Sequence, residues 1–388
     1  MRREVGIAEA RGERVLPVGG RERPHLCFVA PHIWPVFSRD PQLKVVGGAE
    51  VQQSILARLL AREGYRVSIV TFDYGQPRRI ELDGVTVHKT CRPGEGVPVL
   101  RFLHPRLTTL WRALKEVDAD AYYQRSASML TGVIAEFCRR YGKRSIYAGA
   151  SDLDFIPGNP QIRFARDRWL YEHGLRTVDR IVAQNRTQFD TCRAHYGREA
   201  LLIPSCYESP AGASRRDGDL ILWAATVTAH KRPELLLELA RRLPQRRFVL
   251  VGGPAIQAQP DYFDGIRAAA AELPNVQMLG FLPLAEVEPW FDRARVFVNT
   301  SHYEGMPNTF LQAWARGIPT VAAVDVGAGC YPVFTDLERG AHEIERLFSD
   351  EGHWQRSSAR CLEYFQANHS TGQALAHYRR LLTELTVP

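Results

Sequence analysis

The feature that most constrains this chain is an alternation of short apolar runs with amphipathic stretches, which occurs twice along the sequence. Leu26–Ala30 is a run of the first kind. Ala49–Arg62 is a stretch of the second kind, because its apolar residues recur at helical spacing. Strands that alternate with helices form a parallel sheet covered by helices. The sequence therefore predicts an α/β fold.

The predicted elements fall into two groups. The strands predicted in the first half are Leu26–Ala30, Arg66–Thr71, Ala121–Gln124, Ser145–Ala148, Arg180–Ala183 and Leu201–Ile203, with helices at Ala49–Arg62 and Thr131–Tyr141. The strands predicted in the second half are Leu220–Ala224, Phe248–Val251, Val276–Leu279, Val296–Asn299 and Thr320–Val324, with helices near Pro233–Arg242, Asp261–Leu273, Ala285–Asp292 and Asn308–Arg316. Residues 335–385 are predicted to form two or three further helices.

A segment without periodicity separates the two groups. Residues 205–219 (SCYESPAGASRRDGD) are rich in Pro, Gly, Ser and charge, which is typical of a linker. We therefore predict two doubly wound domains, 25–204 and 220–370, that face a cleft. Residues 1–24 are expected to be a flexible extension, and residues 371–388 a helix that packs back on the first domain. Ligands of such sheets gather at the carboxyl ends of the strands, so the chemistry is expected in the loops that face the cleft.

Charge is distributed unevenly along the 388 residues. Residues 1–208 hold 32 basic and 23 acidic side chains, whereas residues 209–388 hold 18 and 20. The first half therefore carries the basic surface. Its arginines are dispersed among acidic residues, with no Lys/Arg run and no aromatic-studded basic strand, which argues against nucleic acid as a partner.

Two further features of the composition bear on location. No apolar stretch approaches the ~18 residues that a membrane-spanning helix needs, and the N-terminus has no apolar signal core. The seven cysteines are scattered and never form a CxxC pair, which predicts buried thiols in a reducing compartment rather than disulfides or a zinc site. We therefore expect a cytoplasmic protein, either soluble or peripheral on the inner face of the membrane.

Two loops have features that suit an anionic ligand. Gly47 and Gly48 open the first long helix pattern, where the free N–H groups of a helix start favour an anion, although such a pair is also typical of a tight turn. The loop 224–232 follows a strand and holds Lys231, the sole lysine after Lys143 in a chain with 45 arginines. A lysine there suits a phosphate as a compact point charge; a surface lysine at a helix start is the alternative.

The most informative segment is 301–317, SHYEGMPNTFLQAWARG. Pro307 suits the first turn of a helix, which would leave the N–H groups at Asn308 unsatisfied and pointing into the cleft. Gln312 falls on the same face, one turn later. Glu304, just outside that turn, suits sugar hydroxyls better than a phosphate; the alternative is a carboxylate favoured by the helix dipole.

These segments together resemble one enzyme family. In order, they are GGAE at 47–50, the lysine loop after the linker's first strand, VGGP at 251–254, LGFL at 279–282 and EGMPNTFLQAWARGIPTV at 304–321. The combination resembles the retaining glycosyltransferases of family 4, which have two Rossmann-like domains in the GT-B arrangement. The resemblance covers roughly residues 25–385 and implies a hexosyltransferase-type enzyme whose donor substrate is a nucleotide-diphosphate sugar, without a further cofactor or metal.

The resemblance also implies roles for single residues. Glu304, the first Glu of the family's E-x7-E motif, would contact hydroxyls of the donor sugar, and Lys231 matches the family's phosphate lysine. The loop at Met306 and Asn308 would supply backbone donors to the diphosphate, and the Gly47–Gly48 loop would add to them. Together with Arg125, discussed below, Glu304 and Lys231 are the predicted catalytic residues.

The remaining site residues, on the nucleoside side and beneath the donor sugar, match the family less closely. The resemblance places Leu279 and Phe281 beside the base. Gln312 stands where the family has a second Glu that binds the ribose, and an amide can still bond to a diol. Thr226 stands among the donor-binding residues where the family often has an Arg, five residues before the lysine. Arg125 falls where the family commonly has a His beneath the donor sugar.

We predict that the chain transfers a sugar, with retention, from the nucleotide donor to a glycan or lipid-linked saccharide, as in cell-surface polysaccharide synthesis. The loop after Asp325 is shorter than in the family. Together with Gln312 and Thr226, this leaves open a non-catalytic nucleotide- or glycan-binding protein of the same fold. A dinucleotide dehydrogenase is disfavoured, because no G-x-G-x-x-G follows a predicted strand.

Overall fold

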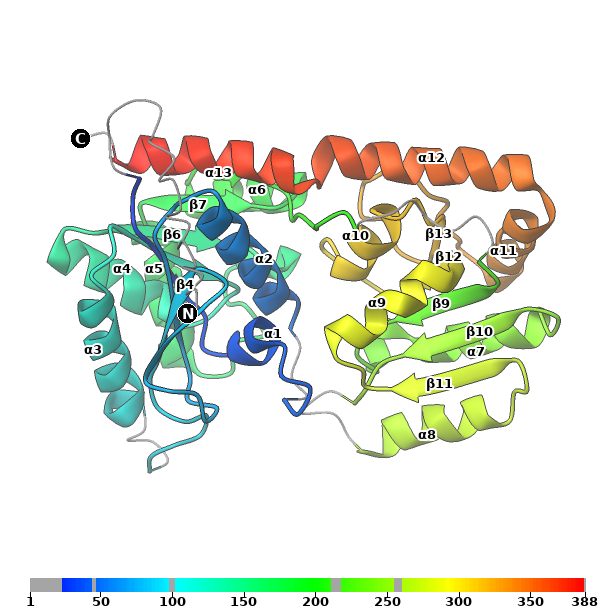
Figure 1. The fold of residues 1–388 in the computed structure, drawn as a ribbon, viewed down its shortest axis with the longest axis horizontal. Coiled ribbons are helices and arrows are strands. Elements are labelled where there is room, and N and C mark those ends of the chain that lie inside the picture. The colour runs from blue at the N-terminus through cyan, green and yellow to red at the C-terminus, as the bar shows by residue number, and fades with distance from the viewer. Residues whose placement is uncertain (1–22, 44–46, 98–101, 211–217, 255–259, 387–388) are drawn as a thin grey trace, which may run out of the picture.

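The computed structural model describes residues 23–43, 47–97, 102–210, 218–254 and 260–386. Nearly all of the predicted extension 1–24 and about half of the predicted linker 205–219 lie outside these ranges. The described chain forms two α/β bodies side by side, each built on its own sheet (Figure 1). None of the helices in these ranges has the length and apolar composition needed to cross a membrane.

The first sheet has eight strands in the order β3-β4-β2-β1-β5-β6-β7-β8. Their bounds are β1 Leu26–Val29, β2 Val67–Thr71, β3 Arg79–Leu82, β4 Val85–Lys89, β5 Ala121–Arg125, β6 Arg144–Ala148, β7 Arg180–Ala183 and β8 Leu201–Leu202. All neighbours pair in parallel except β3 and β4, which form an antiparallel hairpin at one edge. The sequence analysis missed this hairpin and predicted the other six strands.

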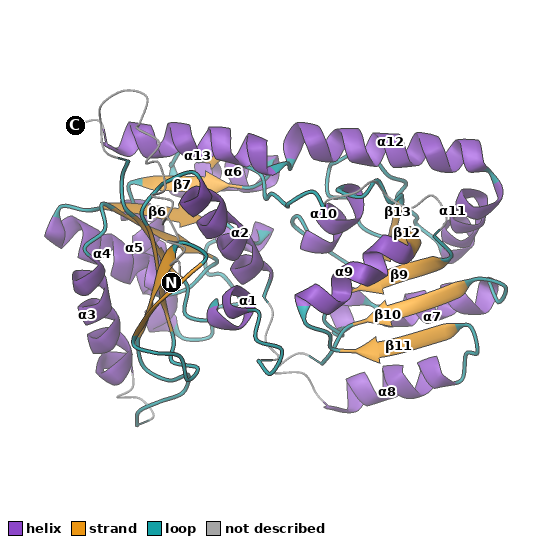
Figure 2. Cartoon of the chain, viewed as in Figure 1, coloured by secondary structure: helices purple, strands orange, loops and turns teal. Residues whose placement is uncertain are grey.

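Helices cover both faces of the first sheet (Figure 2). They are α1 Trp34–Ser38, α2 Gly48–Arg62, α3 Thr108–Val117, α4 Leu130–Tyr141, α5 Ala165–Thr177 and α6 Arg186–Tyr196. Alternate residues of β1 supply the two faces: Leu26 and Phe28 pack with α2, whereas Cys27 and Val29 pack with α3 and α4. This two-sided burial is what a doubly wound parallel sheet requires.

The second sheet is wholly parallel, in the order β11-β10-β9-β12-β13. Its strands are β9 Leu220–Ala224, β10 Arg247–Val251, β11 Val276–Gly280, β12 Ala294–Asn299 and β13 Thr320–Ala322. Its helices are α7 Pro233–Arg242, α8 Pro260–Ala271, α9 Leu284–Arg293, α10 Asn308–Trp314, α11 Leu337–Ser349 and α12 Glu351–Asn368. In Figure 2 the arrowheads of β9, β10 and β11 point toward the first domain, so their carboxyl ends face it.

The chain returns to the first domain through α13 (Thr371–Thr386), which continues the line of α12 along one side of both domains (Figure 1). Leu375, Tyr378 and Leu381 of α13 are buried in the same apolar cluster as β1. The returning segment also meets the outgoing one, since Tyr207 N donates to His369 O at 3.0 Å. The chain therefore passes between the domains twice, at neighbouring places.

The side chain of His369 lies at this crossing. Its Nδ1 lies 2.7 Å from the carbonyl oxygen of Ser205, so Nδ1 must carry the proton. Its Nε2 is buried and has no hydrogen-bond partner among the described residues. Burial lowers the pKa of His369 to about 4, because a second proton would be placed on Nε2 without an acceptor.

We expect the free energy of unfolding to fall as the pH drops from about 6.5 to about 4. The unfolded chain takes up a proton on this imidazole near pH 6.5, while the folded protein keeps His369 neutral down to about pH 4. This contributes a slope of up to ~1.4 kcal/mol per pH unit. His369→Gln, whose amide can still donate to Ser205, should show a shallower slope in urea unfolding measured across this range. Equal slopes in the two proteins would contradict the assignment.

Candidate active site

A cavity of about 850 Å³ lies between the domains, where the carboxyl ends of both sheets face each other. We call it the interdomain cavity. Nine of the predicted site residues line it: Gly48, Arg125, Thr226, Lys231, Phe281, Glu304, Met306, Asn308 and Gln312. The other two do not line it. Gly47 is the residue before α2, and Leu279 is half-buried in β11 against the core of the second domain.

Lys231 and Glu304 form an ion pair in this cavity. The Nζ of Lys231 donates to Oε1 of Glu304, and Oγ of Ser301 donates to the same oxygen at 2.6 Å. The two side chains are only 18% and 11% exposed. Charges in such a place are screened less by salt than charges on the surface. The pair therefore offers the cavity a cation for an anionic ligand and an acceptor for hydroxyl groups.

Two loops are tied together to form this pair. Trp223 Nε1 donates to Thr300 Oγ1 at 2.9 Å, and Thr300 Oγ1 donates to the carbonyl oxygen of Lys231 at 2.7 Å. Arg232 Nε donates to the carbonyl oxygen of Thr300 at 2.7 Å. The loop after β9 and the loop after β12 thus hold each other, because β9 and β12 are neighbours in the sheet.

The loops after β9, β10 and β11 approach one another closely. A Cβ at Gly252 would lie 1.9 Å from the carbonyl oxygen of Ala225, and a Cβ at Gly253 would lie 2.7 Å from Cβ of Phe281. Only glycine fits at these contacts. The three backbones can therefore meet, which places Thr226 and Phe281 at the edge of the same cavity.

The start of α10 contacts the first domain directly. Nδ2 of Asn308 donates to the carbonyl oxygen of Gly48 at 3.1 Å, and Oδ1 of Asn308 accepts from Nε2 of Gln52 at 2.8 Å. Among the residues that the structure describes, none accepts from the N–H groups of Asn308 or Thr309. The starts of α2 and α10 therefore meet across the cavity, with two N–H groups left for a ligand.

Arg125 lies at the end of β5 and is 8% exposed. One of its terminal nitrogens donates to Oε1 of Gln184 at 3.1 Å and to Oγ of Ser205 at 3.0 Å. Its Nε has no partner, and no carboxylate of the described chain lies within ion-pair distance of it. A buried guanidinium without a counter-ion is costly unless an anion compensates it, so Arg125 favours a negatively charged ligand in the cavity.

Gln312 is 2% exposed and contacts Glu288 of α9, a residue that the sequence analysis missed. Nε2 of Gln312 donates to Oε1 of Glu288 at 2.8 Å, and the hydroxyl of Tyr207 donates to the same oxygen at 2.6 Å. Because a carboxylate only accepts, the amide must turn its NH₂ group toward Glu288. Oε1 of Gln312 receives no hydrogen bond from the described residues and is left as an acceptor. Gln312 can therefore accept from a hydroxyl as a carboxylate would.

The sequence matches glycosyltransferases in both domains. Residues 47–204 match the family described as a glycosyl transferase 4-like domain, and residues 218–350 match glycosyl transferases group 1. A D-inositol 3-phosphate glycosyltransferase of Frankia alni is 34% identical over 162 residues, which cover 36% of this chain and 39% of that protein. Mannosylfructose-phosphate synthase of Agrobacterium fabrum is 23% identical over 379 residues, which cover 84% of this chain and 80% of that protein. This chain belongs to the family-4 type of glycosyltransferases.

Solved structures agree with the fold of this glycosyltransferase. Sucrose-phosphate synthase from Thermosynechococcus elongatus aligns with a TM-score of 0.73 at 17% identity, covering 93% of this chain and all of that one. Anabaena HepE in complex with UDP-glucose aligns with a TM-score of 0.71 at 14% identity and the same coverage. These likenesses confirm the predicted GT-B fold with two Rossmann-like domains. The matching D-inositol 3-phosphate glycosyltransferases are covered over only 39% to 44% of their own length.

An aspartate pair in the glycosyltransferase's first domain holds a loop. The backbone N–H of Ala150 donates to Asp154 at 2.7 Å, and Asn185 donates to Asp152 at 2.8 Å. Burial raises the pKa of Asp154, which is fully covered. Within the described ranges, no group of three or more His, Cys, Asp or Glu residues is placed to hold a metal ion. The pair therefore shapes the loop after β6, beside the cavity.

The glycosyltransferase cavity includes residues that the sequence analysis did not single out. Gln52 lies one turn after Gly48 on α2, so the helical period could have indicated it. Gln184 and His32 also line the cavity, each from a loop after a first-domain strand. Glu288 joins the site only because α9 packs beside α10, and no local sequence pattern indicates this packing.

We expect Gln312→Glu to weaken binding of a nucleotide diphosphate about tenfold or more and to lower the melting temperature. The new carboxylate would contact Glu288, and like charges at ~4 Å repel by roughly 4 kcal/mol near a protein surface. The double variant Glu288→Gln/Gln312→Glu should recover most of both losses. Calorimetric titration with UDP and thermal melting measure these effects.

A matched control is available on the surface of the second domain. Gln245 donates to Glu345 at 3.0 Å in an exposed place, so Gln245→Glu should change neither quantity appreciably. The orientation assigned to Gln312 is wrong if its Glu variant behaves like this control.

Proposed function

We propose that this protein transfers a hexosyl group from a nucleotide-diphosphate sugar to an acceptor hydroxyl. The observation that carries the proposal is the pairing of Lys231 and Glu304 inside a cavity that both domains line. Membership of the glycosyltransferase family supports it, as do the UDP and UDP-glucose complexes of HepE, a structural relative. A non-catalytic nucleotide- or glycan-binding role is the outcome that a failed transfer assay would favour.

In this proposal the second domain holds the donor. The diphosphate lies between Lys231 and the N–H groups at Asn308, with the loops at Gly48 and Met306 beside it. The nucleoside extends past Phe281, and its ribose hydroxyls donate to Oε1 of Gln312. Leu279 and Gly47 take no direct part, since neither borders the cavity.

The chemistry follows from where charge develops. The bond between the anomeric carbon and the diphosphate oxygen breaks, and the leaving diphosphate gains negative charge while the sugar becomes oxocarbenium-like. Preorganised donors lower this barrier, and Lys231 with the start of α10 supplies them. Glu304 accepts from hydroxyls of the donor sugar, and Arg125 adds positive charge from the first domain.

The acceptor hydroxyl forms the new bond to the anomeric carbon. In the proposed route it attacks from the side of the leaving group, which takes up its proton, so the configuration is retained. Retention through a covalent intermediate would need a carboxylate nucleophile at that carbon. Glu304 is held by Lys231 and Ser301, which fits a binding role better than a nucleophilic one.

Replacing Lys231 by Met should slow transfer by about 10²-fold, the scale of losing one electrostatic stabiliser. Donor binding should weaken at the same time. Lys143→Met is the matched control, because Lys143 also pairs with a carboxylate, at 2.7 Å from Asp118, and is 20% exposed outside the cavity. Release of UDP from candidate UDP-sugars, with and without acceptor, measures both variants. Equal rates for Lys231→Met and the control would remove Lys231 from the mechanism.

The proposal includes a place of action at an anionic membrane surface, where a lipid-linked saccharide would be presented. Its support is the basic excess of residues 1–208 and a patch formed by Leu103, Phe164 and Arg166, in which the two apolar side chains are 56% and 57% exposed. The ring of Phe102 under the Arg166 guanidinium joins the two segments. Basic and exposed apolar residues together suit an interface with anionic lipid.

Co-sedimentation with vesicles tests this location. Binding should appear with anionic lipid at low salt and decline as salt rises, because the electrostatic part is screened. The double variant Leu103→Ser/Phe164→Ser should bind less, whereas Val333→Ser, at a 42% exposed position of the second domain, should bind like the unaltered protein. No sedimentation at low salt would leave the protein without a membrane role.

A further inference from the structure

Three buried polar side chains line the interdomain cavity on the side of the first domain. They are Arg125 at the end of β5, Gln184 directly after β7 and Ser205 shortly after β8. Oε1 of Gln184 accepts from Nη2 of Arg125 at 3.1 Å and from Oγ of Ser205 at 2.6 Å. Oγ of Ser205 accepts from the same Nη2 at 3.0 Å. We call these three residues the arginine site.

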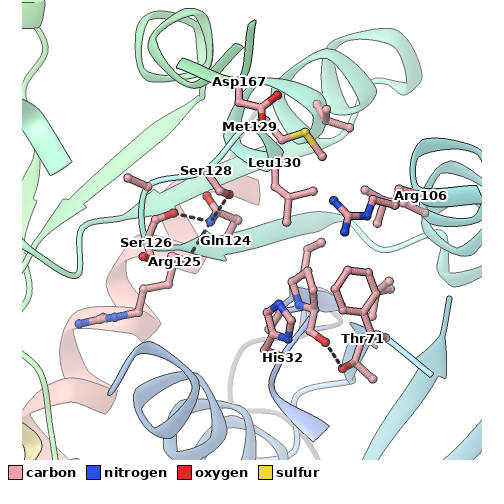
Figure 3. A pocket seen from close by; sticks show the side chains of 18 of the residues that line it. His32, Thr71, Arg106, Gln124, Arg125, Ser126, Ser128, Met129, Leu130 and Asp167 are labelled. Carbon is pink, nitrogen blue, oxygen red and sulfur yellow. Dashed lines mark hydrogen bonds between the residues drawn. The ribbon is translucent and has the colours of Figure 1, made fainter. Parts of the chain in front are cut away.

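Arg125 directs its charge to the interdomain cavity. The residue also borders a neighbouring cavity of about 560 Å³ in the first domain, which Figure 3 shows. There its guanidinium points away from the side chains of Thr71 and Arg106. Its two partners, Gln184 and Ser205, line the interdomain cavity and not the neighbouring one. The charged end of Arg125 therefore belongs to the interdomain cavity.

The charge of Arg125 has no counter-ion within the described ranges. Its partners Gln184 and Ser205 are neutral, and its Nε has no hydrogen-bond partner among the described residues. The hydroxyls of Tyr123 and Tyr378, which also act on it, are neutral groups as well. Because a guanidinium does not lose its proton in a protein, a full positive charge is buried here without an ion-pair partner.

Asp154 is an acidic residue that acts on this charge, but it lies beyond ion-pair distance of Arg125. Its carboxylate accepts from the N–H of Ala150 at 2.7 Å and from the hydroxyl of Tyr147 at 3.0 Å. It is fully covered and does not line the interdomain cavity. Asp154 therefore weakens the positive potential at the arginine site without replacing a counter-ion there.

Glu304, the proposed acceptor for sugar hydroxyls, lies close to the arginine site. A Cβ at Gly305, the next residue, would lie 3.5 Å from Nε2 of Gln184 and 3.7 Å from the carbonyl oxygen of Ala150. The loop of Glu304 thus lies against Gln184, which holds Arg125. A sugar whose hydroxyls donate to Glu304 therefore has Arg125 on its first-domain side.

The diphosphate of the donor already has other partners. In the proposed function, Lys231 and the start of α10 receive it, and the sugar hydroxyls compensate Glu304 when Lys231 turns to the diphosphate. A neutral sugar would leave Arg125 as it is in the empty protein. A sugar that bears a carboxylate would compensate it, because the planar guanidinium matches a carboxylate with two parallel hydrogen bonds.

We propose that the transferred sugar carries a carboxylate and that Arg125 binds it, so that the donor is a nucleotide-diphosphate hexuronic acid. The inference rests on the proposed function and narrows its hexosyl group to a hexuronosyl group. Gln184 and Ser205 position the guanidinium, while Glu304 accepts from the hydroxyls of the same sugar. Arg125 distinguishes the acid from the neutral hexose, since the neutral sugar leaves a buried charge uncompensated.

Calorimetric titration with UDP, UDP-glucose and UDP-glucuronate tests this preference. UDP-glucuronate should bind tenfold or more tightly than UDP-glucose, because hydrogen bonds between ionised groups are among the strongest in proteins. Arg125→Gln should remove this advantage and change the affinity for UDP much less. Arg247→Gln is the matched control, because Arg247 also donates to a glutamine, Gln277, at 3.0 Å but in an exposed place. If Arg125→Gln weakens UDP as much as UDP-glucuronate, Arg125 binds the diphosphate and the inference is wrong.

A second variant keeps Arg125 in place, so the test does not depend on the folding of Arg125→Gln. Gln184→Glu puts a carboxylate where Oε1 already accepts from Arg125 and Ser205. It should raise the melting temperature of the empty protein and cancel the preference for UDP-glucuronate, because Arg125 then has an internal counter-ion. Gln277→Glu, the same change beside the exposed Arg247, should alter neither quantity appreciably. Full preference for UDP-glucuronate in Gln184→Glu would overturn the inference.

The outcomes separate this inference from the proposed function. If UDP and UDP-glucose bind but UDP-glucuronate has no advantage that depends on Arg125, the inference is wrong and the proposed function stands. If no uracil nucleotide binds, the proposed function fails, and free glucuronate is compared with glucose by thermal shift at millimolar concentration. A stabilisation by glucuronate alone that disappears in Gln184→Glu would support the carboxylate site by itself. No such stabilisation would overturn the inference as well.

Discussion

Helix α13 follows the last helix of the second domain along the chain, but its apolar residues are buried in the core of the first domain. This packing holds the two halves of the active-site cavity opposite each other. The donor side of the cavity comes from the loops of the second sheet and the acceptor side from the first. Their separation therefore depends on the two places where the chain crosses. Tyr378 of α13 lies 3.2 Å from Tyr123 of β5, only two residues before Arg125. The helix that ties the domains together thus also supports the strand that carries a predicted catalytic residue.

The charged side chains of the two domains differ in whether they have an internal counter-ion. Lys231 and Glu304 neutralise each other in the absence of ligand, which limits the cost of holding both in a partly buried place. A diphosphate must therefore compete with Glu304 for the lysine, while the sugar hydroxyls compensate Glu304. Arg125 has no carboxylate within ion-pair distance among the described residues and donates instead to the neutral side chains of Gln184 and Ser205. An anionic ligand would compensate its charge without displacing an internal counter-ion, so the first domain gains more from a charged ligand than the second.

Elements with a strong local hydrophobic pattern were predicted well, and those with a weak one were not. β9 and α7 begin and end at the predicted residues, because a continuous apolar run and a Pro at the first helical position mark them locally. The β3–β4 hairpin was missed although Asp83 and Gly84 form its turn with φ of 53° and 74°, the backbone that an Asp-Gly pair favours. Both strands are short, and β3 has no buried residue, so the hydrophobic pattern is weak there.

The same division applies to the site. Glu304, Lys231 and Asn308 were predicted because their loops have a recognisable order of residues, and the structure brings them together in one cavity. Glu288 could not be found, because its relation to Gln312 exists only where α9 and α10 pack side by side. Gly47 lies one position before Gly48, which does line the cavity, and Leu279 lies in strand β11 beside it. A motif identifies a loop, but it does not determine which residues of that loop border the cavity.

The contacts across the cavity differ greatly in strength from those at the crossing. On the cavity side, Gln52 and Gly48 each share one hydrogen bond with Asn308, and such bonds contribute ~1 kcal/mol net apiece. Val36 and Val51 add an apolar contact with the second domain. At the crossing, five apolar residues of α13 are buried in the first domain, and each contributes roughly 1.5–3 kcal/mol. The structure is therefore anchored along α13 and closed only weakly at the start of α10. Because Asn308 belongs both to that closure and to the proposed diphosphate site, a donor that binds there acts at the point where the two domains are easiest to separate.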